Sequence, residues 1–151
     1  MPIFFDNEKK IFKLDTAGSS YVIRVDKDGF LLHLYYGAKI PDVNLPDFEK
    51  RSRYASFSAT TPEADSDYWS GFTPDTWPFE VGCNGCADMR TASLQIRNSD
   101  GNAATDVRYV SHKIYAGKPG IPGLPALFAN EPDDCETLEI LTRDETTGAE
   151  V

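Results

Sequence analysis

The clearest pattern in the chain is a pair of β-branched, aromatic and leucine-rich runs between Ser20 and Gly37, separated by Asp28-Gly29. Such runs favour extended strands, and Asp-Gly suits the left-handed backbone angles of a tight turn, so the pattern predicts a β-hairpin. Both faces of each arm are largely apolar, and we therefore expect the hairpin to lie inside a sheet that is covered on both sides. Strict alternation would place Tyr21, Ile23 and Val25 on one face of the first arm. On the second arm it would place Leu32, Leu34 and Tyr36 on one face, and Leu31, His33 and Tyr35 on the other.

Two later segments repeat this pattern. The runs at 92–98 and 105–118 flank Ser99-Asp100-Gly101-Asn102, whose residue types favour a turn, so a second hairpin is expected there. Residues 136–144 alternate again, with Leu138 and Ile140 against Glu139. A turn at 146–148 then leads into an extended run, which reads as a strand that is cut off as it begins.

The stretch at 41–80 has no sustained hydrophobic period beyond one or two helical turns around 47–53, and it is interrupted by several prolines. A compact domain seldom holds so long a connection unless the loop is functional or forms an interface. Because no longer helical pattern occurs elsewhere, the predicted fold class is all-β.

Aromatic residues gather in the second half of this loop. Exposed rings either stack on a ligand or pack against a partner, and packing against another domain or subunit is favoured here over a direct sugar contact. Both interpretations stay open. The rings concerned are Tyr68, Trp69, Phe72, Trp77 and Phe79.

Composition supports a folded chain, since 40% of its 151 residues are hydrophobic and 12% are aromatic. Length alone predicts one domain. The formal net charge of -9 repels phosphate backbones and anionic lipid, so neither nucleic acid nor a membrane surface is expected as a partner, whereas neutral sugars are compatible with it. Neither a signal-like segment nor a run of about 18 apolar residues is visible, which favours a soluble, cytoplasmic protein.

Three cysteines are too few, and odd in number, for a disulfide framework. Cys83 and Cys86 have the spacing of half a zinc site or a redox pair. The other soft ligands, Cys135, His33 and His112, are not in paired spacings. We therefore prefer a turn built on Asn84-Gly85, and predict neither a metal nor a cofactor.

No catalytic residue is predicted in the chain. Ser111 and His112 are adjacent on an expected strand and so point to opposite faces, which disfavours a nucleophile and base pair. Asp65 and Asp67 are spaced like the start of a calcium loop, but the later ligands and the loop glycine are missing, so a solvated acidic turn is the better interpretation.

Several segments, in this order and spacing, resemble the N-terminal domain of glycoside hydrolase family 36 α-galactosidases (melibiases). A "LYYG" strand end matches His33–Gly37, and an Asp-aromatic-Arg element matches Asp88-Met89-Arg90. A "DLRY-SHRIY-GKP-LPGLPA" run matches 106–119 with 123–126, and "TLEI" matches Thr137–Ile140. The resemblance covers nearly the whole chain.

The resemblance implies an antiparallel β-sandwich of the supersandwich, galactose mutarotase-like type, standing before a catalytic (β/α)₈ barrel. The family hydrolyses terminal α-galactosyl bonds of melibiose- and raffinose-type sugars with retention, through two aspartates on that barrel. This chain has no alternating strand and helix pattern, so residues 1–151 are expected to be only the front part of the sandwich, inactive alone. This expectation overrides the single domain predicted from length, and such a partial sandwich should be poorly stable in isolation.

The resemblance also implies partners: the catalytic barrel of the same parent chain, further subunits of a tetramer, and α-galactosides. The family's loop before the Asp-aromatic-Arg element, here Leu45–Phe79, reaches the pocket of a neighbouring subunit. It departs from the family pattern at 57–60 and 80–85. The alternative hypothesis is a free-standing carbohydrate-binding β-domain with Trp69 and Trp77 as its stacking platform. The substrate-proximal residues implied are Arg53, Tyr54, Trp69, Asp88 and Arg90.

Overall fold

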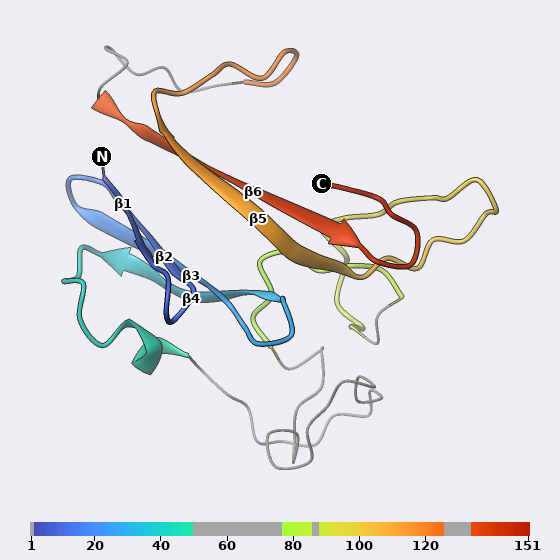
Figure 1. Ribbon diagram of the computed structural model, residues 1–151, viewed down its shortest axis with the longest axis horizontal. Coiled ribbons are helices and arrows are strands. Elements are labelled where there is room, and N and C mark those ends of the chain that lie inside the picture. Colours follow the sequence, from blue (N-terminus) through green and yellow to red (C-terminus); the bar gives the residue numbers. More distant parts are fainter. Residues whose placement is uncertain (1, 50–76, 86–87, 126–133) are drawn as a thin grey trace.

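The computed structural model describes residues 2–49, 77–85, 88–125 and 134–151, which form antiparallel strands joined by loops (Figure 1). A four-stranded sheet has the order β1-β2-β3-β4, and β5 and β6 form a second, two-stranded sheet. The predicted all-β class is therefore confirmed. The elements are β1 Ile3–Asp6, β2 Ile11–Asp15, β3 Ser19–Val25, β4 Leu31–Ala38, the 3-10 helix η1 Leu45–Phe48, β5 Val107–Ala116 and β6 Glu136–Asp144.

The predicted first hairpin is confirmed as β3 and β4. Gly29 has a φ of 84°, as the left-handed turn position requires. The Asp26 carboxylate closes the turn by accepting the backbone N–H groups of Asp28 and Phe30, each at 2.9 Å. The local turn chemistry thus fixes the point at which the chain reverses.

The hairpin departs from strict alternation at a β-bulge. Val22 pairs with Tyr35 but Ile23 pairs with His33, so Leu34 is an extra residue on β4. The expected separation of Tyr36 from His33 is consequently wrong. Tyr21 pairs with Tyr36, and Tyr21 and Ile23 lie on the same face of β3, so the bulge brings His33 and Tyr36 onto one face.

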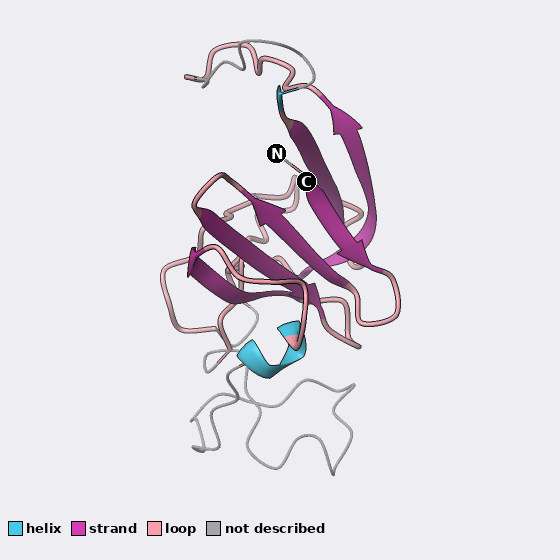
Figure 2. Cartoon of the chain, turned by 90° about the vertical axis from the view of Figure 1, so that its left-hand side faces the viewer, coloured by secondary structure: helices cyan, strands magenta, loops and turns pink. Residues whose placement is uncertain are grey.

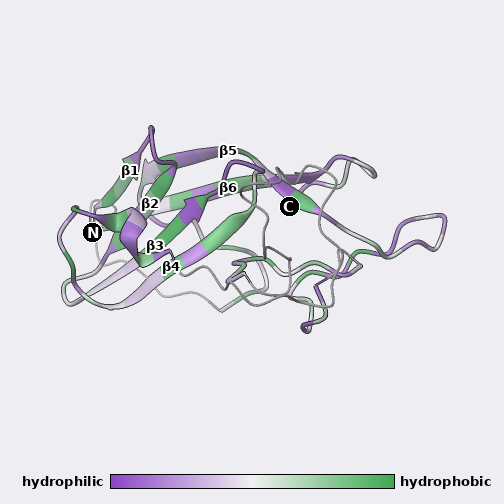
Figure 3. Cartoon of the chain, turned by 90° about the horizontal axis from the view of Figure 1, so that it is seen from below, coloured by the Kyte–Doolittle hydropathy of each residue, from purple (hydrophilic) through white to green (hydrophobic). Residues whose placement is uncertain are grey.

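Both faces of the four-stranded sheet are covered, as the sequence predicted. On one face Ile11, Val22 and Leu34 pack against Leu45 of η1. On the other, the ring of Phe12, which is fully buried, lies 4.5 Å from that of Phe5 and 4.8 Å from that of His112 on β5. Figure 2 shows η1 and the β5–β6 pair on opposite sides of the sheet, and Figure 3 shows hydrophobic and hydrophilic residues alternating along its strands.

A buried ion-pair network joins Lys13 to Asp15 and Asp42. The Lys13 side chain is 2% exposed, and its Nζ lies 2.7 Å from Asp15 and 2.6 Å from Asp42. Burial alone would lower the pKa of Lys13, but its hydrogen bonds to both carboxylates outweigh that effect and raise it. For Asp15, burial alone would raise the pKa, but the hydrogen bonds that Lys13 and Ser20 donate to its carboxylate lower it. The Ser20 hydrogen bond is 2.6 Å long. The ammonium group is thus stabilised by two separate segments of the chain.

The second hairpin predicted around 99–102 is wrong. A turn does form there, because Asn98 N–H donates to the Asn102 carbonyl at 2.9 Å and Gly101 has a φ of 87°. The flanking runs do not pair with each other: β5 pairs instead with β6, along a register from Val107↔Asp144 to Ala116↔Glu136. Turn chemistry is local, whereas strand pairing follows the longest register that side-chain packing can support.

Two smaller predictions about the later strands are confirmed. His112 packs on Phe5 and Phe12 while Ser111 is exposed, so the two side chains do not form a nucleophile and base pair. Past the turn after β6, Thr142 and Val151 exchange backbone hydrogen bonds of 2.8 and 3.0 Å, so the last run is extended as expected.

Among the described residues there is no apolar helix of membrane-spanning length.

The tip of the first hairpin is fastened to β5. Arg108 donates to the Asp28 carbonyl at 2.7 Å, and its guanidinium lies 3.7 Å from the centre of the Phe30 ring. Tyr109 N–H donates to the Gly29 carbonyl at 2.8 Å. Asp26, 7% exposed, sits beneath this contact, and its Oδ2 is buried without a hydrogen-bond partner in the described part of the chain. Burial, with Asp28 nearby, raises the pKa of Asp26 from 3.8 to about 6, although Arg108 opposes the rise.

This raised pKa predicts how stability depends on pH. The contribution of Asp26 is fully present below its unfolded-state pKa and is lost as pH rises through about 6, because folding then buries a charge. We expect Asp26→Asn to unfold with a free energy about 2 kcal/mol larger than the unsubstituted chain near pH 7.5, and with an equal one near pH 4. Urea unfolding at both pH values measures this. The exposed Glu139→Gln is the control, and an equal gain at both pH values would contradict the prediction.

Candidate functional site

Three of the expected substrate-proximal residues, Arg53, Tyr54 and Trp69, lie outside the described residues. The described chain does contain both ends of the segment that carries them. These ends, at Glu49 and Trp77, are each fixed to the β3–β4 hairpin by named contacts. They define where the segment leaves and rejoins the sheet.

The first end is held on the η1 face. Glu49 forms an ion pair with Arg24 of β3. Arg24 pairs across the sheet with Ile11 of β2. Phe48 packs on Tyr35 with ring centroids 5.0 Å apart. Asn44, with a φ of 55°, and Pro46 start the short helix that brings these residues onto the sheet.

The second end extends the sheet along β4. Phe79 forms an isolated β-bridge with Leu32. Two backbone hydrogen bonds flank this bridge, from His33 N–H to the Pro78 carbonyl at 2.7 Å and from Glu80 N–H to the Leu31 carbonyl at 2.9 Å. Trp77, 3% exposed, packs with Phe30 and Leu32, and Phe79 stacks on Phe30 at 4.9 Å. This segment therefore belongs to the core of the sheet.

The burial of Trp77 corrects two expectations. Trp77 cannot form a stacking platform with Trp69, because its indole is enclosed by its own sheet and presents no face to a ligand. Nor does it pack against another domain or subunit, and Phe79 likewise packs within the chain. The rings of Tyr68, Trp69 and Phe72 lie outside the described residues.

A cluster of polar aromatic residues lies beside this second end. The Tyr21 hydroxyl donates to Glu80 Oε2, and His33 Nδ1 lies 2.8 Å from Glu80 Oε1. The ring centroids of Tyr21 and His33 are 5.3 Å apart, and those of Tyr21 and Tyr36 are 5.8 Å apart. Burial and the bond to Glu80 raise the pKa of Tyr21, so its phenol stays protonated and keeps donating. Neither motif nor spacing indicated this cluster, since Glu80 is distant in sequence.

Asp88 and Arg90, the other expected site residues, are bound to each other. Arg90 Nε donates to Asp88 Oδ1 and its terminal nitrogen to Oδ2, both at 2.8 Å. The Asp88 side chain is 4% exposed and that of Arg90 is 45% exposed. The guanidinium lies 5.7 Å from the centre of the Phe79 ring, so the pair braces the second end of the segment.

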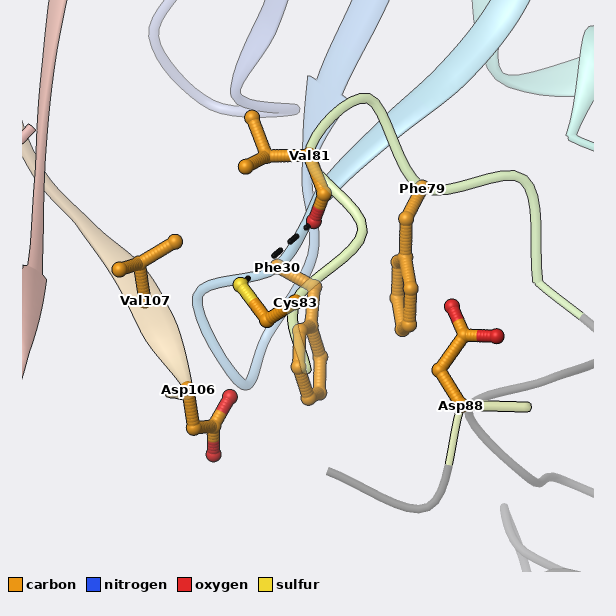
Figure 4. A pocket seen from close by; sticks show the side chains of 7 residues that line it. All are labelled: Phe30, Phe79, Val81, Cys83, Asp88, Asp106 and Val107. Carbon is orange, nitrogen blue, oxygen red and sulfur yellow. Dashed lines mark hydrogen bonds between the residues drawn. The ribbon is translucent and has the colours of Figure 1, made fainter. Parts of the chain in front are cut away.

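A small, partly open hollow is lined on one side by Asp88 of this pair (Figure 4). Its volume of about 10 Å³ has room for about one water molecule, too little for a sugar. The Cys83 thiol faces it, and burial together with the carboxylates of Asp106 and Asp144 raises the pKa of that thiol, which keeps it protonated and unreactive. The residues that line the hollow are Phe30, Phe79, Val81, Cys83, Asp88, Asp106 and Val107.

Within the Cys-x-x-Cys segment, Asn84 and Gly85 form a bend, with Gly85 at a φ of 86°. A side-chain Cβ at Gly85 would come within 2.9 Å of the Ala104 Cβ, so glycine is needed there for space as well as for its backbone angle. Cys86 lies outside the described residues, and within the described ranges no three His, Cys, Asp or Glu side chains are grouped to hold a metal ion.

Comparison with known proteins agrees with this architecture. The family described as Glycosyl hydrolase family 36 N-terminal domain matches residues 29–151. The α-galactosidase AgaA of Geobacillus stearothermophilus is 34% identical over the whole of this chain, and the bifunctional α-galactosidase/sucrose kinase AgaSK of Mediterraneibacter gnavus is 36% identical. This chain thus belongs to glycosyl hydrolase family 36, as part of the N-terminal domain. It spans 20% of AgaA and 16% of AgaSK.

Solved structures give the same match. The galactosidase domain of AgaSK superposes with a TM-score of 0.88 at 34% identity, covering 99% of this chain and 20% of that one. A variant of Geobacillus stearothermophilus AgaA, solved in complex with raffinose, superposes with a TM-score of 0.81 at 35% identity, over 93% of this chain and 19% of that one. The fold is therefore that of the family's N-terminal β-domain, in part.

The Asp88–Arg90 pair predicts a cost for its removal. Asp88→Ala removes a nearly buried carboxylate that accepts two charge-assisted bonds from Arg90, so we expect the free energy of unfolding to fall by about 1–3 kcal/mol. Urea unfolding measures this. The matched control is Glu139→Ala, which breaks the exposed pair with Lys113 and should cost less than about 1 kcal/mol. Equal losses in the two variants would show that the Asp88 pair does not brace the fold.

Proposed function

We propose that residues 1–151 are the front part of the N-terminal β-sandwich of a retaining α-galactosidase and serve it as a non-catalytic scaffold. The observation that carries this is the family match over residues 29–151, together with the superposition on the AgaSK galactosidase domain over nearly the whole chain. This chain corresponds to 20% of the length of AgaA and to 20% of the AgaSK galactosidase chain on which it superposes.

A scaffold role agrees with how the buried carboxylates are used. Asp15 is paired with Lys13, Asp88 with Arg90, and Asp144 accepts the Thr146 N–H at 2.9 Å. A retaining glycosidase needs a free nucleophilic carboxylate and a second one as acid and base. In this proposal both groups belong to a (β/α)₈ barrel in the remainder of the enzyme, which hydrolyses terminal α-galactosyl bonds of melibiose- and raffinose-type sugars.

The proposal includes a contribution to a sugar site of a neighbouring subunit in a homotetramer. Relatives of this chain have been solved with raffinose and with stachyose. Arg53, Tyr54 and Trp69 lie between two ends that the sheet fixes, at Arg24–Glu49 on one face and at Glu80 on the other. In this proposal Asp88 and Arg90 act near the substrate by bracing the second end. The parent enzyme works in the cytoplasm.

The test is an assay of the purified 151-residue chain with a chromogenic α-galactoside, beside the longer protein in which these residues occur. We expect no turnover by the 151 residues, because in this proposal both catalytic carboxylates belong to the barrel, and hydrolysis with retention by the longer protein. Retention is read from the anomer first released, followed by NMR. Turnover by the short chain alone would overturn the scaffold role.

Within the longer protein, Trp69→Ala is expected to raise the KM for raffinose about tenfold or more, since one stacked ring is lost. The control Phe4→Ala, at an exposed ring of β1, is expected to leave it unchanged. An unaltered KM in both variants would remove Trp69 from the sugar site without affecting the scaffold proposal.

A further inference from the structure

The face of the sheet next to Glu80 presents an aromatic ring to solvent. Tyr36 is 70% exposed, although it lies on a strand and pairs with Tyr21. Its neighbour Tyr35, on the opposite face, packs on Phe48 and donates its hydroxyl to the Ala38 carbonyl at 2.8 Å. Tyr36 has no such hydrogen bond, and no partner of its hydroxyl occurs in the described part of the chain.

The bulge at Leu34 assembles this surface. His33 and Tyr36 are three positions apart and would point to opposite faces of a regular strand. The extra residue places both beside Tyr21, with His33 at 5.3 Å and Tyr36 at 5.8 Å between ring centroids. Bulges commonly re-aim side chains next to functional sites.

Glu80 orders the polar groups of the surface. A carboxylate can only accept hydrogen bonds, so both Tyr21 and His33 Nδ1 donate to it, and the rings are held in place. His33 Nε2 then points away from Glu80, and no protein partner contacts it among the described residues. Glu80 thus fixes the imidazole of His33 before any ligand arrives. The Tyr36 ring, which makes an edge contact with Tyr21, adds an exposed ring face and a phenol hydroxyl.

We infer that Tyr36, Tyr21 and His33 form a binding surface for a neutral pyranoside, with one C–H face of the sugar against the Tyr36 ring and its hydroxyls on His33 Nε2 and the Tyr36 hydroxyl. The electron-rich ring face attracts the weakly positive C–H groups, and the two polar atoms fix the orientation of the ring. Glu80 and a formal net charge of -9 disfavour an anion. This site goes beyond the proposed function and involves none of the residues outside the described ranges.

The closing experiment titrates the ¹⁵N-labelled 151-residue chain with methyl α-galactopyranoside and with raffinose, followed by NMR, and repeats the titration by calorimetry. A dissociation constant on the order of 1–10 mM is expected, as is usual for one sugar on an open platform. Shifts should centre on Tyr21, His33, Tyr36 and Glu80. The readout is binding without turnover, so the result is independent of whether the parent enzyme is an α-galactosidase.

Variants separate the parts of the surface. Tyr36→Ala should weaken binding about tenfold or more, Tyr36→Phe should keep it within about threefold, and His33→Ala should weaken it several-fold. Phe4→Ala is the matched control, because Phe4 is also an exposed ring of this sheet, 40% exposed, but lies on the opposite face. Unchanged affinity in Tyr36→Ala would overturn the inference. So would shifts confined to other residues, or saturation by choline, a cation that prefers the same kind of ring face, without any response to sugar.

Discussion

The structure depends on the burial of both faces of the four-stranded sheet. Ile11 and Val22 need η1 as a cover, and Phe12 needs His112 of β5, so the two sides of the sheet are completed by segments far apart in sequence. An uncovered face on either side would expose apolar side chains to water, at a cost of roughly 1.5–3 kcal/mol for each large residue. The four-stranded sheet is thus the element on which η1 and β5 pack from opposite sides.

The parts of this fold that depend on neighbours in sequence could be predicted. Asp28-Gly29 specified a turn because its backbone angles and the Asp26 hydrogen bonds are local. The hairpin predicted from the run at 92–98 was wrong because only its turn is local. Asn98 and Gly101 do form that turn, but the strand that pairs with β5 is selected by packing between segments distant in sequence. The bulge at Leu34 was also hidden, because both faces of this arm are largely apolar and a shift in the alternation therefore leaves no visible mark in the sequence.

The candidate site was predictable only where the resemblance supplied it. Asp88 and Arg90 could be named from a motif, but the contact of Arg90 with the Phe79 ring could not, because alternation does not reveal which distant segments meet. Trp77 looked like an exposed ring because it lies in a proline-rich loop, yet the chain returns to β4 and buries it. Glu80 had no distinguishing signal, since a carboxylate that orders two rings looks like any surface acid until the strands are paired.

The network around Lys13 has a consequence for how this sequence can diverge. Its ammonium group is neutralised by Asp15 on the same strand and by Asp42 after β4. A single replacement leaves the buried Lys13 ammonium or the largely buried Asp15 carboxylate with one partner fewer, whereas a concerted change to apolar residues of similar volume need not be harmful. These three positions are therefore epistatic, and descendants of this sequence should replace them as a set or retain all of them.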